Sequence, residues 1–403
     1  MQEPTDGAQA TSFSGASAAR LSGTFLISGF VMAALGSSRL IVPLIAISLG
    51  AGSMLVGVIA AACTAMPMVL SVAFGRWMDR AGTLPAIGLA TSMIIFASLL
   101  YWALPSRYTL LAVSGLIGTA GVFTHMAATR AVGLGVKVSE RAKSLGYLVL
   151  SYSLFNFFGP VIASHAFEHF GAVPAIGVLG LFALLSVIGT RAVPHFYARE
   201  EQRAADASGP RRAYDLLKTG DLRLWIVISG IFTANQTLYP FILSLHAAQI
   251  GLAASQAGWM LGAFAFGTLT SRFCTPLLVK HANPNITLVI ALVLAAGIYA
   301  VIPSAHGTVS LVVLSAALGL PLGIGAPVSL ALIYEVAPPG RVNEALGISM
   351  SVNNLLQTVF PMLIGVAASS LGVAPMVWVW SLVILVSACM IMLRRHQLER
   401  GAA

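Results

Sequence analysis

The chain has 403 residues, of which 58% are hydrophobic and only 9% charged, whereas an ordinary soluble domain carries about 25% charged residues. These are too few charged side chains to cover a water-exposed surface, so the composition excludes a soluble protein. The net charge of +9 would suit a nucleic-acid partner, but the basic residues follow the connections between apolar segments. That distribution predicts a membrane protein with no nucleic-acid partner.

Apolar segments of about 20 residues, enough helix to cross about 30 Å of hydrocarbon, recur from one end of the chain to the other. They predict an all-α polytopic membrane protein with twelve transmembrane helices, held in a lipid bilayer. The predicted spans are residues 22–48, 53–74, 84–104, 108–130, 143–166, 172–194, 223–248, 254–279, 285–304, 307–335, 343–369 and 373–393.

The basic residues orient these spans. Nineteen of the 22 Lys and Arg residues lie in the tails or in the connections that follow even-numbered spans, and Arg107 alone lies in the opposite set of connections. Lys and Arg are enriched in cytoplasmic connections. Both termini are therefore predicted to be cytoplasmic, in a multi-pass protein of the cytoplasmic (inner) membrane.

The chain divides into two similar halves. An offset of 201 residues pairs Gly50 with Gly251, Gly57 with Gly258, Gly118 with Gly319, Gly146 with Gly347 and Pro160 with Pro361. Two halves of six spans that enter from the same side are the parallel-repeat plan of many secondary transporters. The predicted organisation is a cytoplasmic tail (1–20), an N-terminal six-helix bundle (21–196), a cytoplasmic central loop (197–221), a C-terminal six-helix bundle (222–395) and a cytoplasmic tail (396–403).

The stretch "GRWMDRAG" between spans 2 and 3 contains Gly75, Asp79, Arg80 and Gly82. It resembles the G-x-x-x-D-R-x-G loop of the major facilitator superfamily (MFS). The resemblance extends over all twelve spans, although the second copy, at 276–283, is degraded. It implies two pseudo-symmetric six-helix bundles, secondary transport by alternating access, and a gating role for these four residues. The alternative is that the charges only fix topology.

Span 5 contains "GYLVLSYSLFNFFGPVIAS", which resembles the glycine and proline pattern of MFS exporters through Gly146, Gly159 and Pro160. Phe155 replaces the middle glycine of that pattern, and Ala163 and Ser164 replace its last pair. The resemblance implies a part in gating and favours outward transport. The alternative is ordinary close packing of helices.

Two charges, Arg39 in span 1 and Arg272 in span 8, are predicted to lie within a few ångströms of the midplane, whereas the span centres contain no Asp or Glu. Because guanidinium groups pair with carboxylate, sulfonate or phosphate, the pattern favours an anionic solute. The alternative is that the arginines cap helix ends or extend to water. Further candidate substrate-binding residues, each of which could instead join helices by hydrogen bonds, are His125, Tyr152, Asn156, Asn235, Gln236, Tyr239, Asn353, Asn354 and Gln357.

Export or exchange of an organic anion (antiport) is thus the leading interpretation, with a coupling proton or a counter-anion as the second species. Proton coupling would use His125, Glu335 or the substrate itself, because no buried acid is present. The alternatives are a proton-linked multidrug or neutral-solute exporter and a non-transporting receptor or scaffold. No catalytic cluster, nucleotide-binding motif or metal-type cysteine spacing occurs in the sequence. We therefore expect a functional monomer that is not an enzyme and has no metal or cofactor.

Overall fold

The computed structural model describes residues 15–136, 140–197, 220–281, 283–338 and 342–401. Within these ranges the chain forms twelve long α-helices and one 3₁₀ helix. They are α1 (Gly15–Ser48), α2 (Ser53–Ala81), α3 (Thr83–Ala103), α4 (Thr109–Gly135), α5 (Arg141–Phe170), α6 (Ala172–Ala192), α7 (Gly220–Gln249), α8 (Ala254–His281), α9 (Pro284–Val301), η3 (Ile302–Ser304), α10 (Thr308–Val336), α11 (Val342–Leu371) and α12 (Val373–Gly401).

Eleven of these helices are long and apolar enough to cross a membrane. The twelfth, α8, contains Gln256, Arg272 and several Gly, Ser and Thr residues, which lower its hydropathy. The all-α polytopic fold predicted from the sequence is therefore confirmed. The first helix begins at Gly15, inside the tail expected over residues 1–20.

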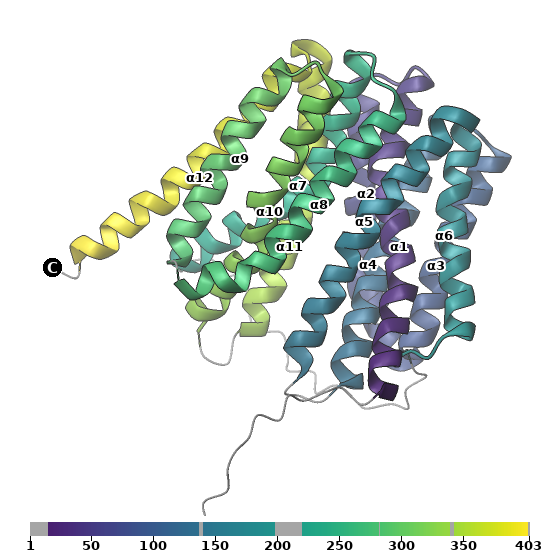
Figure 1. Ribbon diagram of the computed structural model, residues 1–403, viewed down its shortest axis with the longest axis horizontal. Coiled ribbons are helices and arrows are strands. Elements are labelled where there is room, and N and C mark those ends of the chain that lie inside the picture. The colour runs from purple at the N-terminus through teal and green to yellow at the C-terminus, as the bar shows by residue number, and fades with distance from the viewer. Residues whose placement is uncertain (1–14, 137–139, 198–219, 282, 339–341, 402–403) are drawn as a thin grey trace, which may run out of the picture.

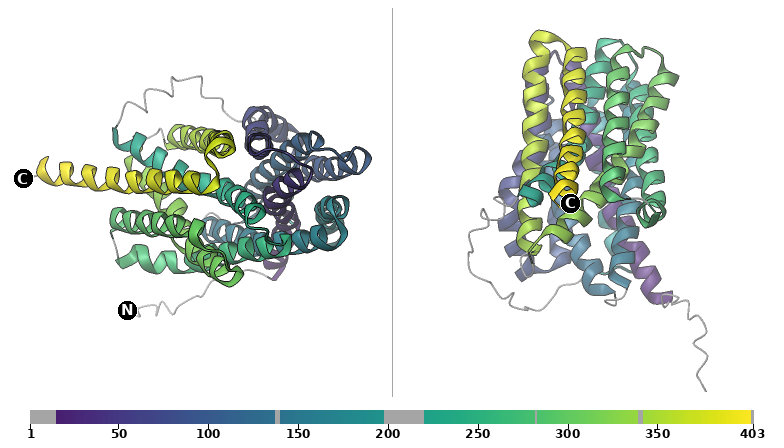
Figure 2. Two further views of the ribbon diagram at one scale, coloured as in Figure 1. Left: turned by 90° about the horizontal axis from the view of Figure 1, so that it is seen from above. Right: turned by 90° about the vertical axis from the view of Figure 1, so that its left-hand side faces the viewer.

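Helices α1–α6 form one half and α7–α12 the other. Figure 2 shows the halves as two groups of helices lying side by side, purple to teal and green to yellow. We call the end of the molecule that holds the connections after α1, α3, α5, α7, α9 and α11 the closed end. The opposite end, which holds the remaining connections and where α1 begins, is the basic end.

Glycines at the closed end repeat between the halves. Gly50 (φ 76°) and Gly251 (φ 71°) follow α1 and α7, and Gly171 and Gly372 (both φ 85°) follow α5 and α11. Side chains strongly disfavour positive φ, which glycine adopts freely. The two members of each pair are 201 residues apart. Gly171 and Gly372 therefore extend the sequence repeat to a second pair of turns with the same backbone geometry.

The halves also repeat their internal packing. A Cβ atom on Gly118 of α4 would lie 1.9 Å from the Cys63 carbonyl oxygen of α2, and one on Gly319 of α10 would lie 2.2 Å from the Phe264 oxygen of α8. Both the glycines and their carbonyl partners are 201 residues apart. The pairs α2–α4 and α8–α10 therefore approach backbone to backbone in the same way, as expected for pseudo-symmetric bundles.

The two halves meet through α2 with α11 and through α5 with α8. A Cβ atom on Gly57 would lie 2.7 Å from the Pro361 carbonyl oxygen, and one on Gly258 would lie 3.0 Å from that of Pro160. These contacts are again equivalent under the repeat. Small residues thus let the halves close tightly at the closed end.

Toward the basic end, α2 and α11 separate. Thr64 and Thr358 share a hydrogen bond of 3.0 Å. Two turns further along the same face of α11, Ser351 is exposed, and its neighbour Met350 is 64% exposed. In Figure 1 the halves lie together at the upper end and diverge toward the lower end, where α1 begins.

We predict that Gly118→Ala and Gly319→Ala destabilise the protein, because each added Cβ would collide with a backbone carbonyl; such overpacking costs about 1–3 kcal/mol. Thermal unfolding in detergent measures the effect. Gly88→Ala in α3 is the matched control, because its added Cβ meets nothing within 4 Å. Equal melting temperatures for Gly118→Ala and the control would contradict the packing.

Candidate functional site

Arg39 reaches from α1 to the opposite half. Its Nη1 donates a hydrogen bond of 3.2 Å to the backbone carbonyl oxygen of Gln236 in α7. The guanidinium also lies against the Cys63 thiol of α2, and its Nε is buried without a hydrogen-bond partner. One donor of a permanent cation therefore remains unused inside the protein.

Arg272 reaches in the other direction, from α8 to α5. Its Nη1 donates to the Ser153 hydroxyl and, at 3.4 Å, to the Val149 carbonyl oxygen. Each half thus contributes one half-buried arginine whose charged end contacts the other half. The two arginines tie the halves together with hydrogen bonds to neutral oxygens.

No carboxylate shares the depth of these arginines. Every Asp or Glu within a helix lies among the first or last three residues of that helix. The hydrogen bonds of both guanidiniums in the described part of the chain go to carbonyl and hydroxyl oxygens. Ionised groups at such depth are expensive and usually mark a pathway or a binding site.

The two guanidiniums lie at different depths. Gly159 of α5 packs on Ala33 and Ser37 of α1, close to the level of Arg39, whereas Arg272 contacts α5 at Val149 and Ser153. Val149 and Ser153 precede Gly159 along α5, so the Arg272 guanidinium contacts α5 closer to its N-terminal end. Arg272 lies on the side of the basic end.

Four other candidate residues lie near helices that meet at the centre. His125 of α4 is exposed, and its ring centroid is 5.8 Å from that of buried Tyr152. Asn156 packs against the backbone of α1 at Gly36. Asn354 lies half-buried on the face of α11 that contacts α2 one turn further along. Gln236, whose carbonyl oxygen accepts the hydrogen bond from Arg39, lies in α7.

The remaining candidates join helices within the C-terminal half. Asn235 accepts hydrogen bonds from the Tyr299 hydroxyl (2.7 Å) and the Trp380 indole (3.1 Å). Three other bonds have the same character: Tyr239 with Ser315, Gln357 with Thr237, and Asn353 with Ser229. These side chains stabilise the bundle, and Asn235, Tyr239 and Gln357 are buried.

The residues predicted to act in gating have varied surroundings. Gly82 has φ 86° in the turn between α2 and α3, so a side chain there would be strained. A Cβ atom on Gly75 would meet only the end of the Met126 side chain, at 3.5 Å. Arg80 is exposed. The side chain of Asp79 lies outside the described residues, as do those at 275–282 in the degraded second copy.

In α5, two members of the glycine and proline pattern pack tightly and one does not. A Cβ atom on Gly159 would lie 2.7 Å from the Ala33 carbonyl oxygen, and Pro160 is buried beside Gly258 of the other half. A Cβ atom on Gly146 would meet nothing within 4 Å. Gly159 and Pro160 therefore shape the contacts of α5 with α1 and α8.

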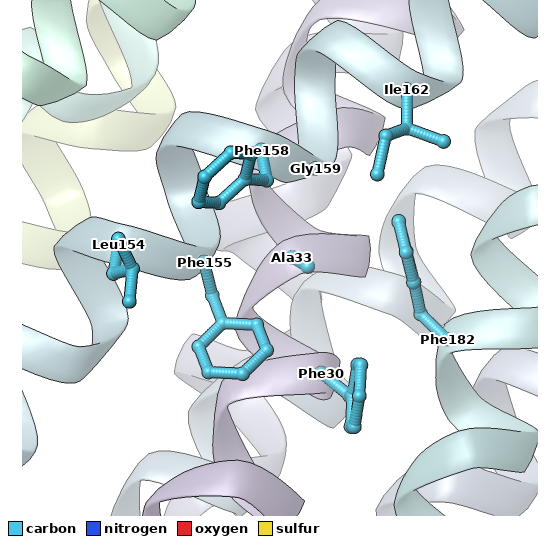
Figure 3. Close-up of a pocket in the computed structure, with 8 residues that line it drawn as sticks. All are labelled: Phe30, Ala33, Leu154, Phe155, Phe158, Gly159, Ile162 and Phe182. Carbon is cyan, nitrogen blue, oxygen red and sulfur yellow. The ribbon is translucent and has the colours of Figure 1, made fainter.

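An apolar cavity of about 130 Å³ lies at some distance from these polar groups, between α1, α5 and α6 (Figure 3). It has no charged or hydrogen-bonding side chain in its lining, so it is unsuited to a polar solute. Its lining residues are Phe30, Ala33, Leu154, Phe155, Phe158, Gly159, Ile162 and Phe182.

Sequence reasoning missed the partners of the arginines and the bonds between the halves. Ser153, Thr64, Thr358 and Glu168 carry no signal of their own in one sequence, because serine and threonine are common in membrane helices. Only the adjacency of α5 with α8 and of α2 with α11 gives them a role.

Two halves of six membrane helices, meeting at one end and carrying charged residues between them, define a secondary transporter fold. The family model described as "Major Facilitator Superfamily" matches residues 24–308 and 224–402. The chain therefore belongs to the major facilitator superfamily. This confirms the resemblance seen in the loop after α2 and makes the protein an MFS transporter of some solute.

Similar solved structures support the same fold. A POT family transporter in complex with a thioalcohol-conjugated peptide is 13% identical, with a TM-score of 0.73 and 94% of this chain and 96% of that chain covered. The nucleoside transporter NupG is 13% identical, with a TM-score of 0.70 and coverage of 92% and 99%. A POT family transporter with 5-aminolevulinic acid is 13% identical, with a TM-score of 0.73 and coverage of 93% and 95%. No curated protein sequence matched.

We predict that Asn235→Leu lowers thermal stability, because it leaves the Tyr299 hydroxyl and the Trp380 N–H buried without their partner. Each unsatisfied group costs about 1–3 kcal/mol. Thermal unfolding followed by tryptophan fluorescence reports the change. The neighbouring variant Gln236→Ala is the control, because it keeps the backbone carbonyl that Arg39 uses. A melting temperature for Asn235→Leu equal to that of the control would refute the structural role.

Proposed function

We propose that the protein moves a small organic anion across the membrane by alternating access, and that the anion binds between the halves at Arg39 and Arg272. The observation that carries this proposal is the pair of half-buried guanidiniums, one from each half, at a depth where the chain has no carboxylate. Gln236, His125, Asn156 and Asn354 are the nearest candidates for further polar contacts.

The hydrogen bonds of the arginines suggest how binding would drive the conformational change. A carboxylate or phosphate is a stronger acceptor for guanidinium than a neutral carbonyl oxygen is. An entering anion would therefore compete with the Gln236 and Val149 carbonyls and the Ser153 hydroxyl. Because those oxygens belong to the opposite half, occupancy would change the contacts that relate the two halves.

The different depths of the arginines favour two binding steps or an extended anion. Arg272, nearer the basic end, would meet an anion entering from that end before Arg39 does. This difference in depth suits a molecule with acidic groups at both ends, or successive contacts by a smaller one. Arg39 has a buried Nε free for the deeper contact.

The distribution of the basic residues supports a cytoplasmic basic end, and with that orientation the separation of α2 and α11 would correspond to a state open toward the cytoplasm. The pattern in α5 that resembles MFS exporters favours efflux, and exchange of one anion for another needs no buried acid. The path lies between halves of a single chain, which supports a functional monomer in the inner membrane.

We predict that transport by purified protein in proteoliposomes follows the charge of the solute. Radiolabelled lactate, succinate, citrate and glycerol 3-phosphate are the anionic probes, with glucose and tetraphenylphosphonium as neutral and cationic probes. Arg39→Gln and Arg272→Gln should each weaken apparent affinity roughly 10- to 150-fold, because loss of a hydrogen bond to a charged group costs about 1.5–3 kcal/mol. Lysine at either position should restore part of the affinity.

Arg107→Gln is the matched control, because Arg107 also donates to a carbonyl oxygen, that of Gly50, but lies at the closed end. Its transport should equal that of the wild type. Normal anion transport by the Arg39→Gln, Arg272→Gln double variant would exclude the proposed site. Transport of tetraphenylphosphonium or glucose in place of every anion would favour the drug or neutral-solute exporter, and absence of any flux would favour a receptor or scaffold.

We predict that Asp79→Asn slows transport and leaves substrate affinity much less affected, because the loop after α2 is expected to lock the basic end rather than to bind solute. The initial rate and the half-saturating concentration, measured in the same proteoliposomes, separate the two effects. Arg76→Gln, which removes an exposed charge near the end of α2, is the control. A normal rate for Asp79→Asn would remove the gating role.

A further inference from the structure

A carboxylate joins the two halves at the closed end. Glu168 lies in the last turn of α5, and its Oε2 accepts a hydrogen bond of 2.9 Å from the backbone N–H of Ser255. Ser255 is the second residue of α8, so the bond caps that helix from the opposite half. The unpaired N–H groups and the positive end of the helix dipole both favour a negative charge at this place.

Glu168 is the single acidic residue at this end of the molecule. The connections after α1, α3, α5, α7, α9 and α11 and the helix turns beside them contain no other Asp or Glu, and all lie within the described residues. No other carboxylate can therefore replace it. Other contacts between the halves at this end include the close packing of Gly57 on Pro361 and of the His165 ring on Trp259.

The groups around Glu168 allow it to exchange protons with water. Glu168 is exposed, and His165 and His169 lie beside it on α5. The His165 Nδ1 lies 2.8 Å from the Val161 carbonyl oxygen, and the ring packs edge-on against Trp259 of α8, with centroids 6.2 Å apart. The first turn of α8 contains no titratable side chain. Tyr101, Arg107, Tyr108, His246 and His306 are the other titratable or basic groups at or near the closed end.

We propose that Glu168 is a proton-binding site that controls opening of the closed end. In its carboxylate form it holds the N-terminus of α8 against α5. Once protonated, the neutral carboxyl group loses its attraction to the helix dipole and to the N–H. The N-terminus of α8 then loses the charged cap that the opposite half supplies.

The sign of the pH effect follows from these charges. The carboxylate stabilises the closed arrangement at neutral and alkaline pH, and that stabilisation is lost as the pH falls and Glu168 binds a proton. Acid on the side of the closed end therefore favours opening to that side. The site would supply the proton-sensitive carboxylate that the middle of the membrane lacks, and it would act whatever solute is carried.

Distance measurements between spin labels test the proposal without any substrate, so its failure is distinguishable from failure of the anion site. Labels replace Tyr108 and Val309, exposed and equivalent positions at the closed end of the two halves, in a background without Cys63, Cys274 and Cys389. In nanodiscs, lowering the pH from 8 to 3.5 should shift wild-type protein toward a longer distance. Glu168→Gln should give the longer distance at pH 8 and lose the pH response.

Two further variants decide which group is responsible. Glu140→Gln removes a half-buried carboxylate that precedes α5 at the basic end and should leave the pH response unchanged. The double variant His165→Gln, His169→Gln should retain the response with a shifted midpoint. The proposal is overturned by a wild-type distance that does not change with pH, by a normal response in Glu168→Gln, or by loss of the response in the histidine double variant.

Discussion

Two permanent positive charges inside the membrane-spanning region are the constraint on which the rest of this structure depends. A guanidinium that faced lipid would be costly by several kcal/mol, and no carboxylate lies at the depth of Arg39 or Arg272. Each is instead satisfied by oxygen atoms of the opposite half. The two arginines therefore favour contact between the bundles in this arrangement. Neither arginine has a permanent ionic partner there among the described residues.

Such contacts suit a molecule that must change shape. Hydrogen bonds from arginine to backbone carbonyl oxygens are strong enough to hold an arrangement, yet an anion can replace them because it is the better acceptor. An ion pair with a buried carboxylate would be harder to break, since separation leaves two uncompensated charges. The absence of acidic residues from helix centres is thus as informative as the presence of the arginines.

Contact between the halves depends on small residues. Glycines at equivalent places in α2 and α8 lie against carbonyl oxygens of prolines in α11 and α5, so the backbones approach closely at these places. The larger polar residues act elsewhere: Asn235, with Tyr299 and Trp380, holds the C-terminal half together. Hydrogen bonds between side chains thus support the interior of the C-terminal half, and close contacts at glycines join it to the N-terminal half, an arrangement that suits rocking of one bundle against the other.

The sequence by itself determined the membrane class, the helices, the two-fold repeat and the presence of unpaired buried arginines. Hydropathy and glycine positions are local properties, and the 201-residue offset reappears in the φ angles of Gly50 and Gly251. The sequence did not distinguish the role of Asn235, which supports packing, from that of Gln236, whose carbonyl binds Arg39. Adjacent residues of a helix point in different directions, and the sequence does not say which direction faces which neighbour. Only the tertiary structure decided that Glu168 meets Ser255 and that Arg272 meets Ser153. Those partners lie 87 and 119 residues apart, so their contact depends on how α5 and α8 pack together, which the pattern within one helix does not specify.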